Sequence, residues 1–243
     1  MEYTVENYDF KKAIQQLINQ KLKGILLDRK FVQYKRNFYA RELGEVVQII
    51  YFALRKDELF LWAYFLPIYF PTDNICNYGE RFYGCYEREK LDKGKQLENY
   101  YKIQKPNFEK MANKLIECIL PEMERIDSLA KLIDNVMNDG GTIFGKKYGS
   151  NRYISDMDFY MLNVYKCKTD NFPKGKEQLL MLKQTLKDSG EWEFSFKKHI
   201  YAIIEFLFPD EDINIDDYKT VFLQRYNIVC SEMRKKYKLK LST

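Results

Sequence analysis

The chain has 243 residues, of which 46% are hydrophobic, 16% aromatic and 31% charged, and its formal net charge is +5. Abundant apolar residues and only 11 glycines and 6 prolines exclude a disordered or collagen-like chain. The single histidine excludes a metal site with two histidine ligands, and the pI near 8.7 lies below the value of about 9 that is typical of a nucleic-acid-binding domain.

The cysteines and the first residues indicate a reducing, cytoplasmic environment. No two cysteines have the spacing of two to four residues that is typical of zinc sites. The opening MEYTVENYDF is too polar and acidic for a secretory signal. The longest apolar run, 59–70, is far shorter than the roughly 20 residues of a membrane-spanning helix. We therefore expect no membrane association.

A helix is predicted first, over 9–23, because apolar residues recur there with a period of 3.6. Asp9 is its expected N-cap and Gly24 its expected left-handed stop. Three β-rich runs separated by turns then predict an antiparallel meander, with strands at 36–42, 46–54 and 59–69. The long, irregular stretch 72–105 contains an aromatic segment, 81–86, that we interpret as an edge strand.

From Pro106 onward, helical periodicity dominates the sequence. Pro106 suits a first helical turn, Pro121 is expected to end or kink that helix, and Gly140-Gly141 to stop the next one. Further helices are predicted at 155–168, 174–188, 191–208 and 215–237. The sequence thus predicts an α+β fold, with an N-terminal helix on an antiparallel sheet of three to five strands in 1–105. An all-helical region, 106–243, should follow and share one continuous core with the sheet.

The order of these motifs resembles a bacterial family of uncharacterised domains over about residues 8–138. The matching segments are an amphipathic helix, Lys35–Arg41 (KRNFYAR), Gly44–Ile50 (GEVVQII) and, later, Ile119–Leu132 (ILPEMERIDSLAKL). The chain departs from the family pattern just before Phe31, where a glycine is expected. The resemblance implies an α+β fold in a soluble intracellular protein. It transfers no catalytic residue, because the family has no settled activity.

Motifs for catalysis or metal binding are incomplete. Acidic residues alternate over 210–216 as in a calcium loop, but Ile215 and Val221 replace the required glycine and glutamate. Gly140–Lys147 has phosphate-loop glycine spacing, but Lys147 replaces the hydroxyl residue that would bind magnesium. The sequence does not pair His199 with a nucleophile or an acidic residue in a catalytic arrangement. Carboxylates two residues apart, such as Glu122 and Glu124, do not share a helix face. We therefore predict no catalytic residue, no metal site and no cofactor.

Arginines and lysines alternate with aromatic residues in two segments, 29–41 and 78–88. Such pairs suit both protein hot spots and stacking on nucleic-acid bases. The candidate partner-binding residues are Arg36, Tyr39, Arg41, Tyr78, Arg81, Tyr83, Tyr86 and Arg88. A third basic cluster, Arg234–Lys240, ends the last predicted helix, where cations interact favourably with the helix dipole.

Three functions remain open on this basis. The first is a non-enzymatic protein-binding module, such as a bacterial immunity or defence-associated accessory protein. The second is single-stranded nucleic-acid binding through the aromatic and basic loop. The third is metal-dependent hydrolysis by carboxylates that are distant in the sequence.

Overall fold

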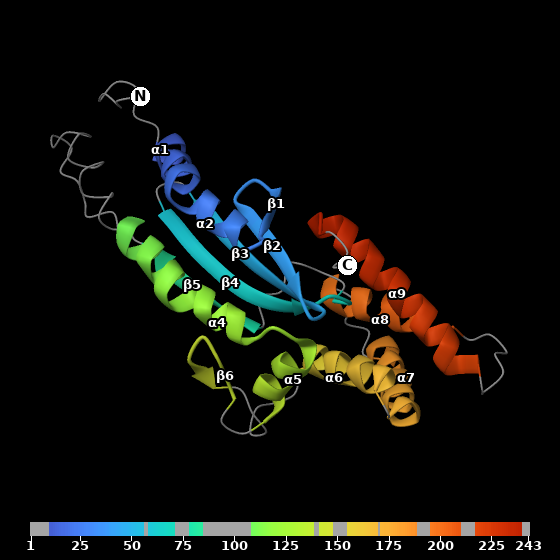
Figure 1. The fold of residues 1–243 in the computed structure, drawn as a ribbon. Helices are drawn as coiled ribbons and strands as arrows, with labels where there is room; N and C mark the ends of the chain where they lie inside the picture. The colour runs from blue at the N-terminus through green and yellow to red at the C-terminus, as the bar shows by residue number, and fades with distance from the viewer. Residues whose placement is uncertain are drawn as a thin grey trace.

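The structure is a computed structural model that describes residues 10–55, 58–70, 78–84, 108–138, 141–147, 155–169, 171–188, 195–209 and 217–239. An N-terminal helix packs beside an antiparallel sheet, and the rest of the described chain is helical apart from one short β-hairpin (Figure 1). The predicted α+β fold is confirmed.

The first helix is longer than predicted. It runs through α1 (Phe10–Leu17), a π-helical turn η1 (Ile18–Leu22) and α2 (Lys23–Asp28). Gly24 does not stop it, because this residue keeps a helical conformation inside the element. Lys30 instead takes the left-handed φ of 64° that follows the helix, close to the place where the resemblance leads us to expect a glycine. The expected cap, Asp9, lies outside the described residues.

Within the described residues, five strands form the sheet in the order β1-β2-β3-β4-β5, and every neighbouring pair is antiparallel. Their bounds are β1 Val32–Lys35, β2 Phe38–Leu43, β3 Val46–Arg55, β4 Glu58–Pro67 and β5 Tyr78–Gly84. The three strands of the predicted meander are therefore confirmed, as is an edge strand within the 72–105 stretch. Gly44 and Glu45 both have positive φ and close a two-residue turn between β2 and β3.

The two faces of the sheet meet different parts of the chain. On one face, the Arg41 side chain reaches the carbonyl of Arg29 after α2, and Gln48 reaches the carbonyl of Met123. On the other face, Glu42 forms a bidentate ion pair with Arg234, at 2.6 and 2.8 Å. Both faces of the sheet are therefore in contact with other parts of the chain, as strands that are apolar on both faces require.

The helix that starts at Phe108 continues through Pro121. Residues 108–114 are helical, and the π-helical turn η2 (Leu115–Ile119) and α4 (Leu120–Arg125) follow without interruption. Pro121 therefore does not end the helix. Proline has no N–H to donate, and it is placed in the first turn of α4, directly after a π-turn in which the N–H of Leu120 donates to the carbonyl of Leu115.

The stretch predicted to resemble a phosphate loop forms a β-hairpin. Helix α5 (Leu129–Met137) begins at the Ser128 N-cap, and β6 (Thr142–Ile143) and β7 (Lys146–Lys147) follow. Phe144 and Gly145 make the turn, with φ of 51° and 76°. Their backbone therefore forms a hairpin turn between two strands, whereas a phosphate loop leads from a strand into a helix.

Four helices occupy the remaining described chain, close to their predicted positions. They are α6 (Asp156–Lys168), α7 (Phe172–Asp188), α8 (Ser195–Leu207) and α9 (Tyr218–Tyr237). Ser155 and Asp158 form a capping box that starts α6. These helices gather at one end of the sheet in Figure 1, where the turn between β2 and β3 also lies.

Polar contacts join the sheet to these helices. Glu45, in the β2–β3 turn, accepts from the Tyr226 hydroxyl at 3.1 Å and pairs closely with Lys168. The buried Tyr69 hydroxyl donates to the carbonyl of Met161 at 2.8 Å, and Tyr160 donates back to the carbonyl of Tyr69. Among the described residues, no helix combines the length and the apolar character that a bilayer crossing requires.

Candidate protein-binding surface

Three aromatic residues lie side by side across the middle of the sheet. Phe38 on β2 is in register with Tyr51 on β3, which is in register with Trp62 on β4. Register partners project from the same face of a sheet, and all three side chains remain partly exposed. We call Phe38, Tyr51 and Trp62 the aromatic row.

Buried rings hold one end of the aromatic row. The Phe38 and Tyr51 rings stack at 3.6 Å with an interplanar angle of 11°. Tyr34 meets Phe38 at 5.6 Å, and Tyr237 from α9 meets Tyr34 edge-on at 5.1 Å. Because Tyr34 and Tyr237 are buried, they fix the geometry of the exposed rings beside them.

Cations flank the same end of the row. The Lys35 ammonium group lies 5.7 Å from the Tyr34 ring centroid and 5.8 Å from that of Phe38. Arg36 is exposed in the turn between β1 and β2, and its Nε donates to Gln15 at 3.5 Å. Arg36, one of the predicted partner-binding residues, is thus two residues from Phe38 along the chain, and its hydrogen bond to Gln15 joins it to α1.

The second predicted segment is described in part. On β5, Arg81 is the register partner of Trp62, and Tyr83 and Tyr78 pair with Phe60 and Phe65. The backbone therefore places Arg81 at the far end of the aromatic row. Tyr86 and Arg88 lie outside the described residues.

Two predicted partner-binding residues, Tyr39 and Arg41, are buried, with exposed fractions of 0% and 6%. The Arg41 guanidinium lies 4.5 Å from the Phe31 ring centroid, and its Nε donates to Gln48 at 2.8 Å. We therefore correct the sequence-based assignment and give both residues structural roles. They alternate with Phe38 and Ala40 along β2, so they project from the opposite face to the aromatic row.

Replacing Tyr39 with phenylalanine is expected to raise the free energy of unfolding by about 1 kcal/mol. The Tyr39 hydroxyl is buried without a hydrogen-bond partner among the described residues, and burial raises its pKa. The change removes an unsatisfied polar group and keeps the ring. Urea denaturation measures the effect. Tyr69→Phe is the matched control and should be destabilising, because Tyr69 donates to Met161; equal effects of both changes would contradict this account.

Tyr51 and Trp62 are not among the residues that the sequence predicts for partner binding. Both lie in strands that are apolar on nearly every position, so no alternation marks which side chains reach the surface. The strand register and the cover on each face decide this, and neither can be read from one strand alone. Pairing the three predicted strands across their two short turns would have placed Tyr51 opposite Trp62 and next to Phe38.

The residues considered for catalysis have structural partners. Glu122 accepts from Arg125 at 2.7 Å, Glu124 accepts from Arg29 at 3.2 Å, and Asp158 belongs to the α6 capping box. His199 is exposed on α8. Within the described ranges, no group of three or more histidine, cysteine or acidic side chains could hold a metal ion. The acidic stretch 210–216 lies outside those ranges.

Two described cysteines are poor nucleophiles. Burial raises the pKa of Cys167 to about 12 and that of Cys230 to about 11. Both thiols are therefore protonated near neutral pH, whereas thiolate is the reactive form.

Comparison of the chain with protein-family models, with curated proteins and with solved structures finds no match. The resemblance to an uncharacterised bacterial family therefore stays a prediction.

Proposed function

We propose that this chain is a non-enzymatic protein-binding module of the bacterial cytoplasm, and that its partner docks on the aromatic row. The observation that carries the proposal is the alignment of Phe38, Tyr51 and Trp62, which are partly exposed on three neighbouring strands, with the exposed Arg36 in the turn that leads to Phe38. Tryptophan, tyrosine and arginine are the residue types most enriched among binding hot spots. An immunity or defence-associated accessory protein would act in this way, by occupying its partner.

The ring geometry favours a protein over single-stranded nucleic acid. A base stacks on an open ring face, but Phe38 and Tyr51 cover one face of each other at 3.6 Å. Tyr34 and the Lys35 ammonium group lie against Phe38 as well. The stacked pair therefore leaves fewer open ring faces for a base, whereas the aliphatic and aromatic side chains of a protein surface can also pack against ring edges.

Tyr51→Ala and Trp62→Ala are each expected to weaken partner binding at least tenfold, which corresponds to about 1.4 kcal/mol. Immobilised wild-type and variant proteins would be compared for the proteins they retain from a lysate of the native host. The affinity of the retained protein would then be measured after purification. Circular dichroism and the melting temperature would verify that each variant is folded.

Phe206→Ala is the matched control, because Phe206 is an aromatic residue that is 40% exposed and lies on α8, outside the sheet that carries the aromatic row. It should leave partner binding unchanged. The proposal fails if no retained protein distinguishes the Tyr51 and Trp62 variants from the Phe206 variant. Retention of a single-stranded oligonucleotide with the same dependence on Tyr51 and Trp62 would establish the nucleic-acid alternative instead.

A further inference from the structure

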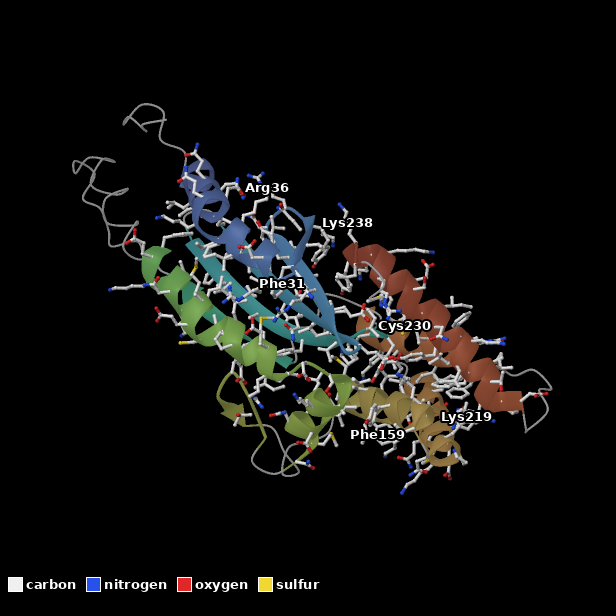
Figure 2. The ribbon with its side chains drawn as sticks, in the orientation of Figure 1. Phe31, Arg36, Phe159, Lys219, Cys230 and Lys238 are labelled. Carbon is white, nitrogen blue, oxygen red and sulfur yellow. The ribbon has the colours of Figure 1, made fainter. Side chains whose placement is uncertain are left out.

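Two segments that are distant in the sequence bring cations together beside the aromatic row. Lys35 and Arg36 lie at the turn between β1 and β2, and Lys236 and Lys238 lie at the end of α9; all four are exposed. We call these four residues the basic rim. Arg36 and Lys238 both lie along the upper edge of the molecule in Figure 2.

The contact between two buried tyrosines explains this convergence. The Tyr34 and Tyr237 rings meet at 5.1 Å. The Lys35 ammonium group lies 5.7 Å from the first ring centroid, and the Lys236 ammonium group lies 5.6 Å from the second. Rings that are in contact therefore carry one cation each, one from the sheet and one from α9.

Two of the four rim residues have no acidic partner within the part of the chain that the structure describes. Glu42 pairs with Arg234, and Glu232 pairs with Lys235. Arg234 and Lys235 are not members of the basic rim, so these two carboxylates pair with other cations. Among the described residues, Arg36 and Lys238 have no carboxylate within salt-bridge distance. The dipole of α9 accounts for cations in its own last turn, but it does not account for Lys35 and Arg36, which belong to a β-turn.

We infer that the partner contacts the basic rim through a carboxylate-rich protein segment while its apolar side chains cover the aromatic row. This inference rests on the proposed function. The four cations of the rim repel one another, and a partner surface of negative charge relieves this repulsion. Such charge complementarity also accelerates association and selects the partner. The row and the rim are joined through Tyr34 and Phe38, so one acidic and apolar segment can cover both.

A fluorescein-labelled poly-L-glutamate peptide tests the inference at low ionic strength, with fluorescence anisotropy as the readout. The double variant Arg36→Glu, Lys238→Glu is expected to bind the peptide at least tenfold more weakly than the wild type. The milder double variant Arg36→Gln, Lys238→Gln should lie between them, and it keeps the test valid if charge reversal disturbs the fold. The matched control is Lys187→Glu, Lys219→Glu, which changes the net charge equally at exposed positions on α7 and at the start of α9.

Three outcomes would overturn the inference: no binding of the peptide by the wild type, equal loss in the control and the rim variants, or tighter rim-dependent binding of an oligothymidine or a phosphatidylserine vesicle. The test is separate from that of the proposed function, because polyglutamate has no apolar side chains and does not need the aromatic row. A partner that requires Tyr51 and Trp62 but tolerates the charge reversal would support the proposed function and overturn only the acidic partner.

Discussion

Replacing Gln48 with leucine is expected to lower the free energy of unfolding by about 3 kcal/mol. Gln48 is completely buried. Its amide nitrogen donates to the carbonyls of Met123 and Ile126, at 2.5 and 2.9 Å, and its oxygen accepts from Arg41. Leucine fills a similar volume but leaves all three partners without this hydrogen bond. A buried guanidinium that loses its acceptor accounts for the largest share of the cost.

Urea denaturation at neutral pH measures this loss. Gln20→Leu is the matched control, because Gln20 is exposed on η1 and should change stability by less than about 0.5 kcal/mol. In the double variant Gln48→Leu, Arg41→Met, both partners become apolar, so the combined loss should be smaller than the sum of the single losses. Additive losses would show that Gln48 and Arg41 are not coupled in the way we describe.

Replacing Gly44 with alanine is also expected to cost about 3 kcal/mol of unfolding free energy. Gly44 has a φ of 50°, and a Cβ atom built there lies 2.5 Å from the carbonyl oxygen of Asp127 and 2.8 Å from the Cα of Ser128. The Gly44 carbonyl also accepts from the N–H of Leu129 at 2.9 Å. The added methyl group would push the start of α5 away from the β2–β3 turn and lengthen this hydrogen bond.

Gly145→Ala separates backbone strain from this close approach. Gly145 has a φ of 76°, but nothing lies within 4 Å of a Cβ atom built there. Its replacement should therefore cost only the strain of a left-handed alanine, about 1 kcal/mol. If the two alanine variants unfold at the same urea concentration, the close approach at Gly44 contributes nothing to stability.

Gln48 and Gly44 both lie in a segment that carries the resemblance to a known family. The segment Gly44–Gln48 and the segment 119–132 carry the resemblance to an uncharacterised family, although they are some 70 residues apart. In the structure Gly44 adjoins Asp127 and Ser128, and Gln48 binds Met123 and Ile126. Both motifs therefore have a structural explanation, which is the docking of the β2–β3 hairpin on the end of α4.

The residues predicted for partner binding on β2 and in the turn before it differ in their exposure. Arg36 is exposed, because a charged residue in a turn has no core to enter. Tyr39 and Arg41 had the same local composition and yet are buried. Their burial depends on the residues after α2 and on α4, which cover one face of β2 and leave the aromatic row on the other face partly exposed.

The order of the first helix, strands β2 to β4 and the later helices was determined by the sequence alone, because hydrophobic periodicity and turn residues act within a few residues of one another. Strand β1 and the β6–β7 hairpin were not predicted. The sequence predicted helix ends at Gly24 and Pro121, but neither helix ends there. In the tertiary structure the first helix continues to Asp28, and the second continues through a π-turn. The aromatic row and the basic rim also required the tertiary structure. The aromatic row depends on the register of three strands, and the basic rim depends on the contact between a turn and the end of a distant helix. Neither the register nor this contact can be read from a single segment.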